Sequence, residues 1–212
     1  TCALPISFDK QSGLLVSYRY KKQEYIHNGQ GPRPFFWRAP TDNDYGAKLP
    51  VRLKAWKEAS YQEPKAESFN VVRDKDTTAV KVTYRFPQTD ARWDITYKVY
   101  GNGVIKVDNH FVAENAQTPM IPRVGLRMQL PARITSLTYY GRGPEENYRD
   151  RRTSQFIGEY TSGIQDMYEP YVRPQENNHR TDIYWCTLTS KAKEGLLFVA
   201  DRTFEMNVSR SE

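Results

Sequence analysis

Apolar and polar residues alternate with a period of two wherever the sequence is regular. The clearest case is the stretch in which Val80, Val82, Tyr84 and Phe86 alternate with polar side chains. Successive side chains of a β-strand point to opposite faces of the sheet, so this pattern predicts a strand with one buried face. The same pattern predicts further strands at 93–99, 105–111, 124–130, 134–140, 196–200 and 204–208.

Turn and helix signals set the fold class. Gly101-Asn102-Gly103 separates two predicted strands and supplies the residues that tolerate the positive φ angles of a tight hairpin. The best helical stretch, at about 53–59, is too short to change the class. With 13 Pro and 12 Gly punctuating the strands, the sequence predicts an all-β fold, a sandwich of antiparallel strands.

Neither a linker nor a repeat divides the chain, so we expect a single β-sandwich domain over residues 1–212. Three long segments, at about 29–50, 141–152 and 160–182, lack a regular pattern. Most connections in a compact sandwich are short, so we expect the functional residues in these three segments.

Composition excludes several classes of protein. An aromatic content of 13% is too high for a disordered chain, and no apolar stretch is long enough to span a membrane. The net charge of +6 comes from scattered Lys and Arg, which does not favour a nucleic-acid partner. Cys2 and Cys186 are too far apart in sequence for a metal knuckle or a CxxC redox pair. The first residues contain neither Met nor a signal-peptide pattern, so we expect a piece of a longer chain and leave its compartment open.

The first irregular segment contains the sequence WRAPTDNDYG at 37–46. Its Asx-rich part lacks the spaced acidic ligands and the terminal Glu of an EF-hand, which argues against a calcium loop. Asx side chains commonly form turns with their own backbone, so we expect an Asx turn braced by Arg38. The segment from Thr41 to Lys48 is expected to be a mobile loop, with Gly46 as its hinge or its turn residue.

The second segment contains GRGPEENYRDR at 141–151. Glu145 and Glu146 are not the carboxylate pair of a retaining glycosidase, because sequence neighbours in an extended chain point apart. The surrounding arginines favour an Arg–carboxylate network that ties the loop to the sandwich. We therefore expect Asp150 and Arg151 to be structural.

The third segment, DMYEPYVRPQEN at 166–177, combines Tyr, Glu and Asn side chains. Such side chains serve sugar recognition and loop support equally well, and composition does not separate these two roles. The candidates for either role, from the second and third segments together, are Glu146, Asn147, Tyr148, Tyr168, Tyr171, Glu176 and Asn177. His27, His110 and His179 lack the spacing of metal ligands, and no phosphate loop or serine-hydrolase elbow is present.

Together and in this order, the three sequences resemble the C-terminal domain of bacterial β-galactosidases of glycoside hydrolase family two, also called the β-galactosidase small chain. The resemblance extends from about Ile6 to the end of the chain. It departs from the family pattern at Asn178-His179, where Gly is frequent, and Asn tolerates the left-handed conformation that Gly would supply.

The resemblance implies a β-supersandwich of the galactose-mutarotase-like type that continues beyond the point corresponding to Glu212. It implies that the two catalytic glutamates belong to a preceding TIM barrel, so we expect no catalytic residue in this chain. The implied partners are the other domains of the parent β-galactosidase, terminal β-galactosides bound by the full enzyme, and further copies in a homo-oligomer. The resemblance implies no cofactor here, any Mg²⁺ and Na⁺ of the parent being held by other domains.

The residues nearest to the substrate in the full enzyme are expected to be Thr41, Asp42, Asn43, Asp44 and Gly46. Two other functions remain open, an autonomous carbohydrate-binding module and a purely structural interface domain.

Overall fold

The computed structural model describes residues 5–115 and 118–210. Its contacts divide the chain into two compact units, one up to Arg38 and from Gly46 to Leu130, the other Ala39–Tyr45 and the chain from Pro131. The expectation of a single domain stays a prediction. Cys2 lies outside the described residues.

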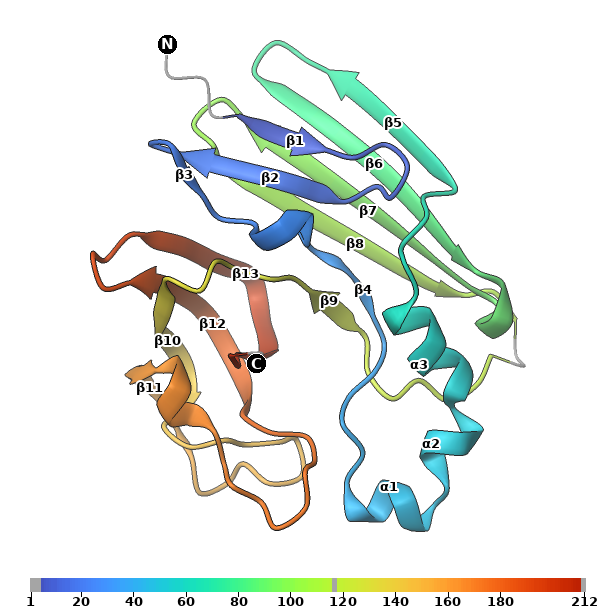
Figure 1. Cartoon of the computed structure of the whole chain (residues 1–212), viewed down its shortest axis with the longest axis vertical. Helices are drawn as coiled ribbons and strands as arrows, with labels where there is room; N and C mark the ends of the chain where they lie inside the picture. Colours follow the sequence, from blue (N-terminus) through green and yellow to red (C-terminus); the bar gives the residue numbers. More distant parts are fainter. Residues whose placement is uncertain (1–4, 116–117, 211–212) are drawn as a thin grey trace. The chain divides into compact units, whose positions relative to one another are not determined.

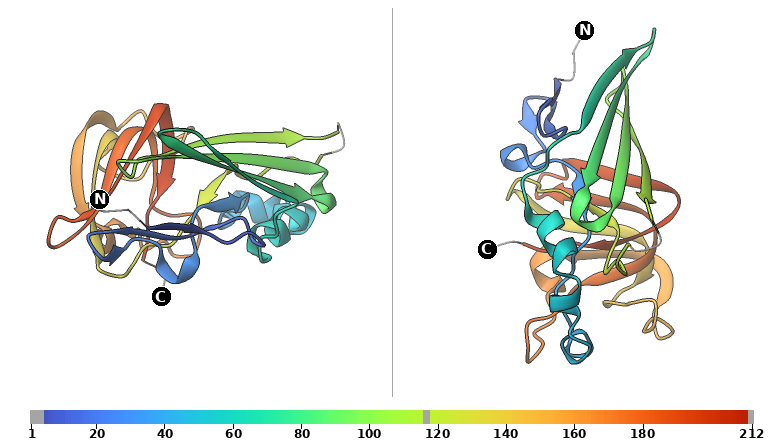
Figure 2. Two further views of the ribbon diagram at one scale, coloured as in Figure 1. Left: turned by 90° about the horizontal axis from the view of Figure 1, so that it is seen from above. Right: turned by 90° about the vertical axis from the view of Figure 1, so that its right-hand side faces the viewer.

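The first unit is built on a four-stranded antiparallel sheet in the order β5-β6-β7-β8 (Figure 1). A three-stranded sheet, β1-β2-β3, forms a second layer, and Figure 2 shows the two layers face to face in the view from above. The rings of Phe8 and Tyr97 meet between these layers, 5.1 Å apart. The strands of the unit are β1 (Ile6–Phe8), β2 (Leu15–Tyr20), β3 (Gln23–Glu24), β4 (Arg33–Phe35), β5 (Ser68–Arg73), β6 (Thr77–Phe86), β7 (Ala91–Tyr100), β8 (Ile105–Ala113) and β9 (Gly125–Arg127).

Short helices complete the connections. They are η1 (His27–Gly29), α2 (Leu49–Arg52), α3 (Lys54–Tyr61) and η2 (Pro87–Thr89). A further short helix, α1 (Asp42–Gly46), belongs to the second unit except for Gly46. The predicted helix at 53–59 thus corresponds to α3. The indole of Trp56 on α3 is completely buried against Phe36, with ring centres 4.7 Å apart.

The predicted alternation is confirmed in this unit. Val80, Val82, Tyr84 and Phe86 are all buried. The Gly-Asn-Gly junction forms the β7–β8 hairpin, in which Gly103 alone of the three residues has a positive φ, at 92°.

The second unit is a four-stranded antiparallel sheet in the order β11-β10-β12-β13 (yellow to red in Figure 1). The elements of this unit are β10 (Ile134–Gly143), β11 (Phe156–Gly163), η3 (Ile164–Met167), β12 (His179–Ser190) and β13 (Gly195–Asn207). Buried pairs such as Leu137 with Leu188 and Tyr139 with Cys186 face each other across β10 and β12. Burial raises the pKa of the Cys186 thiol to about 12, so this thiol is protonated and unreactive.

The predicted all-β class with antiparallel sheets is confirmed, with three local corrections. The strand predicted at 124–130 is reduced to β9, and Val124 and Leu126 are exposed rather than buried. Pro34 of β4, which pairs with Leu126, has no N–H to extend that ladder.

The stretches predicted as two strands at 196–200 and 204–208 form the single strand β13. The irregular segments are also shorter than predicted, because β4, α1, the ends of β10 and β11, and the start of β12 lie within them. Among the helices that the structure describes, none has the length and apolar character needed to cross a membrane.

Candidate functional site

Polar side chains gather in the second unit around the start of β12. Buried residues here include Glu146, Asn147, Glu176, Asn178, His179 and Thr181. These residues and their partners form a connected set that we call the polar network. It consists of Glu146, Asn147, Tyr148, Arg151, Tyr171, Glu176–Thr181, Glu205 and Asn207. Polar groups can be buried in this number only if they form hydrogen bonds with one another.

Asn147 lies at the centre of the network and is completely buried. Its Nδ2 donates to the carbonyl oxygens of Arg142 and Glu145, both at 3.0 Å. Its Oδ1 accepts from the Thr181 amide at 3.0 Å and the Thr181 hydroxyl at 2.6 Å. Its own amide donates to the His179 carbonyl at 2.8 Å. Every polar atom of this side chain is used, so Asn147 fastens the loop after β10 to β12.

Glu146 is the main acceptor of the network. Its carboxylate accepts hydrogen bonds from Arg151 and from the Tyr171 hydroxyl, and the Asn178 amide donates to it at 2.9 Å. The Tyr148 hydroxyl is 3.4 Å away. Burial, together with the negative charge of Glu146, raises the pKa of Tyr148. These contacts within the chain therefore fix the position of the Glu146 carboxylate.

His179 connects the network to β13. Its ring stacks on Tyr148 with centres 5.1 Å apart, and its two nitrogens lie 2.8 Å from Asn207 Oδ1 and 3.0 Å from Glu205 Oε2. Asn207 Nδ2 donates to Glu176 Oε1 at 2.9 Å. The other oxygen of Glu176 accepts from the Ala39 amide at 3.2 Å, so the segment before α1 is tied to the same network.

The loop before β12 is closed by its own asparagines. Asn177 donates to the Glu169 carbonyl at 2.6 Å and accepts from the Glu169 amide at 3.1 Å. Asn178 has a φ of 62°, which confirms that Asn adopts the left-handed conformation at this position. These bonds give the 168–178 segment a defined shape.

The Arg–carboxylate contacts expected in the second segment are present, but with other partners than sequence proximity indicates. Arg151 pairs with Glu146, whereas the neighbouring Asp150 is exposed and forms no ion pair with the described residues. Arg142 and Arg152 both reach Asp182, at 2.7 and 3.0 Å. Burial alone would raise the pKa of Asp182, but the hydrogen bond from Arg142 and the charges of both arginines lower it.

The Thr41–Lys48 segment is not an irregular loop, because its first part is the short helix α1. Thr41 and Asp44 explain the helix start. The Thr41 amide donates to Asp44 Oδ2 at 2.8 Å, and the Asp44 amide lies 3.4 Å from Thr41 Oγ1, the arrangement of a capping box. Gly46 ends the helix without a positive φ, so its backbone does not require glycine, and its role as a hinge stays a prediction.

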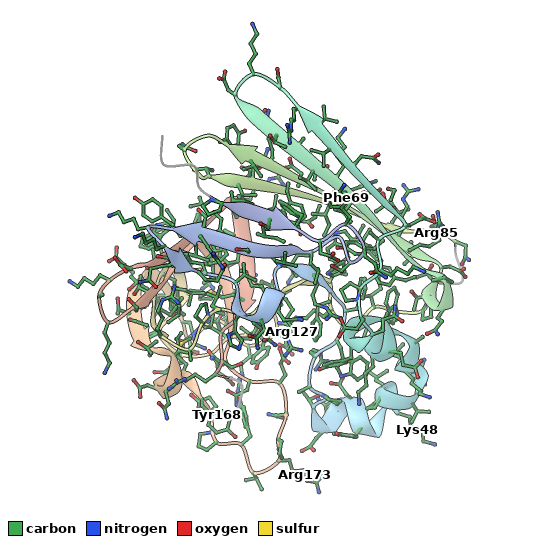
Figure 3. All side chains as sticks on the ribbon, turned by 45° about the horizontal axis from the view of Figure 1, so that its top comes forward. Lys48, Phe69, Arg85, Arg127, Tyr168 and Arg173 are labelled. Atoms are coloured by element: carbon green, nitrogen blue, oxygen red, sulfur yellow. The ribbon has the colours of Figure 1, made fainter. Side chains whose placement is uncertain are left out.

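The other predicted residues are more exposed. Asp42, an exposed residue like Asn43, lies 3.4 Å from Arg173, and the two side chains of this pair are 71% and 78% exposed. A pair this exposed contributes little to stability. Tyr168 is exposed on the loop that carries Arg173, as labelled in Figure 3. Arg38 is partly buried, and its bracing of an Asx turn stays a prediction.

One hollow of about 350 Å³ opens beside the network in the second unit. It is lined by Glu145, Glu146, Arg151, Ser154, Gln155, Glu169 and Tyr171. Glu146 is occupied by its internal partners, whereas the carboxylates of Glu145 and Glu169 form no hydrogen bond with the described residues. The hollow thus combines free acceptors with an arginine and a tyrosine hydroxyl.

Sequence reasoning did not select His179, Thr181, Asp182, Glu205 or Asn207 as site residues. The first three lie at the end of the third segment, where buried polar side chains hide the alternation expected at the start of β12. Glu205 and Asn207 come from β13, far along the sequence, and no local pattern links them to the network. For α1 a usable signal was present, namely Thr41 followed three residues later by Asp44.

Comparison with known proteins assigns the family. The family model described as β-galactosidase small chain matches residues 2–212. This chain belongs to the β-galactosidase small-chain family. It is 36% identical over 200 residues to a β-galactosidase of Priestia megaterium, an alignment covering 94% of this chain and 19% of that protein.

Similar identities relate the small-chain sequence to other bacterial enzymes. It is 35% identical over 206 residues to a β-galactosidase of Lactobacillus delbrueckii subsp. bulgaricus, which covers 96% of this chain and 20% of that protein. For a β-galactosidase of Streptococcus thermophilus the identity is 32% over 210 residues, covering 97% and 20%. The chain therefore spans about a fifth of the length of these relatives.

Within residues 5–115 and 118–210, no group of three or more His, Cys, Asp or Glu side chains could hold a metal ion. The expectation that Mg²⁺ and Na⁺ are held by other domains of a parent enzyme stays a prediction.

Proposed function

We propose that this chain is a non-catalytic part of a β-galactosidase, in which it holds loops beside the active site of the full enzyme. The parent would hydrolyse terminal β-galactosides with retention, using two glutamates in a TIM barrel. The family assignment and the much greater length of the β-galactosidase relatives support this proposal.

The main support for this proposal is that the buried carboxylates are engaged in hydrogen bonds within the chain. A retaining glycosidase needs two carboxyl groups about 5–5.5 Å apart that face the sugar. Glu146 and Glu176 instead accept hydrogen bonds from Arg151, Tyr171, Asn207 and backbone amides of the same chain. Carboxylates bound in this way support loops and are not free to attack or protonate a glycoside.

The loop nearest the substrate is proposed to be the one containing α1, with Thr41, Asp42, Asn43, Asp44 and Gly46. The bond from the Ala39 amide to Glu176 and the pair of Asp42 with Arg173 connect this segment to the 168–178 loop. The network would thus set the position of both loops for the rest of the enzyme.

The test is made in the full-length parent. Asp44→Ala removes the side chain that accepts from the Thr41 amide and should disorder the start of α1. We expect kcat/KM for an aryl β-galactoside to fall about tenfold, a cost of about 1.4 kcal/mol in the transition state. Asp76→Ala is the matched control, since it makes the same change at an exposed residue in the turn between β5 and β6, outside the loops assigned to the active site. Unchanged kinetics in a normally folded Asp44→Ala enzyme would leave the interface domain as the better description.

The hollow beside Glu145 and Glu169 favours a second candidate, an autonomous carbohydrate-binding module. The free carboxylates can accept hydrogen bonds from sugar hydroxyls, and Arg151 can donate hydrogen bonds to those hydroxyls. The hollow, at about 350 Å³, accommodates a sugar ring. Titration of the isolated chain with galactose and lactose, followed by NMR, tests this candidate. Saturable shifts that vanish in Glu169→Ala would support it, and no shifts up to about 50 mM sugar would exclude it as a useful binder.

A further inference from the structure

Two arginines lie directly opposite each other in the first unit, in a part of the chain that none of the three family sequences covers. Arg33 of β4 and Arg127 of β9 are cross-strand partners in an antiparallel pair. Both line a hollow of about 80 Å³, together with Gln30, Ser60, Tyr61, Met128 and Gln129. Figure 3 labels Arg127 in this region. Like charges placed opposite each other on neighbouring strands are destabilising, so this pair calls for a physical reason.

Arg33 has a structural role that uses part of its guanidinium. Its Nη2 donates to the Ser60 carbonyl at 3.1 Å and to the Gln62 carbonyl, at the C-terminal end of α3. Burial lowers the pKa of Arg33; the charge of Glu63 opposes this effect and that of Arg127 adds to it. Its Nε and Nη1 form no hydrogen bond with the described residues, so they remain available to a ligand.

Arg127 has no such role, yet its position is well defined. Its guanidinium carbon lies 5.2 Å from the centre of the Phe35 ring and 5.9 Å from that of Tyr61. The two rings are themselves in edge contact, 5.5 Å apart. Stacking on aromatic faces fixes the plane of a guanidinium while leaving its N–H groups free. Arg127 forms no hydrogen bond or ion pair with the residues that the structure describes.

We infer that this hollow, between Arg33 and Arg127, binds an oxyanion group, a carboxylate or a phosphate. A guanidinium held by aromatic rings presents a fork of donors that matches such a group. The hollow holds only a few water volumes, which suits one carboxylate or phosphate and not a sugar ring. Gln30 and Gln129 line the same hollow and would add amide donors. A bound negative charge would offset the repulsion between the arginines. This inference does not depend on the proposed function.

The test uses the 212-residue chain and two probes at constant ionic strength, inorganic phosphate and N-acetylglutamate amide, with chloride as the reference anion. A bound probe should raise the Tm by about 3–5 °C at ten times its dissociation constant. Phosphate also stabilises proteins by exclusion from their surface, so the measured quantity is the difference between wild type and Arg127→Gln. Arg73→Gln is the control, because it removes the same charge from an exposed site on β5 that has no described partner.

We expect at least a tenfold weaker response in Arg127→Gln, an intermediate response in Arg127→Lys and no change in Arg73→Gln. Arg127 is chosen over Arg33 because loss of the bonds from Arg33 to α3 would itself destabilise the fold. Tighter binding of phosphate would identify a phosphate-bearing ligand, and tighter binding of N-acetylglutamate amide would identify a protein-like carboxylate. Equal Tm responses of wild type and Arg127→Gln to both probes would overturn the inference.

Discussion

Asn147 and Thr181 are joined by two hydrogen bonds to one oxygen, since Asn147 Oδ1 accepts from both the amide and the hydroxyl of Thr181. Both residues are completely buried. The bonds connect the loop after β10 to the first residues of β12. The second and third sequence segments, which are separate in the chain, therefore form one structural unit around this contact.

Removal of the Asn147 side chain should be costly. In Asn147→Ala the carbonyls of Arg142 and Glu145 and the amide of Thr181 lose their partners inside the protein. Buried groups left without partners cost about 1–3 kcal/mol each, so we expect a loss of about 3 kcal/mol or more. Urea unfolding measures this, with Asn70→Ala on the exposed side of β5 as the control, which should change stability by less than about 0.5 kcal/mol. Equal losses in the two variants would contradict the structural role of Asn147.

Glu146 should matter more than its partner Arg151. The Arg151 side chain is 58% exposed, so Arg151→Ala should cost only about 1 kcal/mol. Glu146→Ala strips the acceptor from Tyr171, Arg151 and the Asn178 amide, and should cost about 3 kcal/mol.

Asp150→Ala is the internal comparison for this pair, because Asp150 is exposed and has no ion-pair partner in the described chain. Thermal unfolding of the three variants should rank Glu146→Ala below Arg151→Ala, with Asp150→Ala close to wild type. A drop in Tm for Asp150→Ala equal to that of Arg151→Ala would contradict this ranking and support the expectation that Asp150 is structural.

The glycines at positions 46 and 141 should respond in opposite ways to alanine. A Cβ on Gly46 meets nothing within 4 Å, and its φ is not positive, so Gly46→Ala should be neutral or stabilise by up to about 1 kcal/mol. A Cβ on Gly141 would lie 2.9 Å from Ile183 Cα and 3.0 Å from the Asp182 carbonyl. Backbone atoms cannot move aside cheaply, so Gly141→Ala should lose about 2 kcal/mol or more. Matched chemical denaturation of the two variants checks this, and a destabilised Gly46→Ala would disagree with the helix α1.

Acid should weaken the β2–β3 hairpin through Glu24. Burial raises the pKa of this carboxyl, but hydrogen bonds from Ser17, the Ile26 and Tyr18 amides and Arg19 outweigh it and lower the pKa to about 2. A lowered carboxyl pKa means that the stabilisation is fully present above the unfolded value of about 4.5 and is lost as the pH falls through about 2.

After allowance for solvent screening, we expect Glu24 to contribute about 2 kcal/mol at pH 7. Glu24→Gln should therefore lose stability at pH 7 and show a flatter dependence between pH 5 and about 2. Stability measured against pH for both proteins decides the matter. Parallel curves of stability against pH for the two proteins would show that folding does not change the pKa of Glu24.

The period-two pattern predicts the strands whose buried side chains are apolar, such as β6 with Val80, Val82 and Tyr84. It does not predict the start of β12, where His179 and Thr181 are buried although polar. These residues are inside because Asn147, Asn207 and Glu205 satisfy them, and those partners come from distant parts of the chain. Hydrophobic periodicity carries no information on such pairings.

The candidate site, like the strands, was only partly predictable from the sequence. The sequence indicates that arginines and carboxylates near 141–152 form a network, because these residue types pair wherever they are partly buried. It does not indicate that Arg151 selects Glu146 over the adjacent Asp150, since this choice depends on a turn that points Asp150 to solvent. The helix α1 (Asp42–Gly46) was predictable from the capping pattern of Thr41 and Asp44, whereas the Asx turn braced by Arg38 stays a prediction.

The most direct test of the account is hydrolysis of an aryl β-galactoside by the isolated 212-residue chain. The chain should fold. It should show no turnover above a matched blank, because its buried glutamates are bound to internal donors. Turnover that survives repurification and is lost in Glu146→Gln or Glu169→Gln would contradict the central claim that this chain is a non-catalytic part of a larger enzyme.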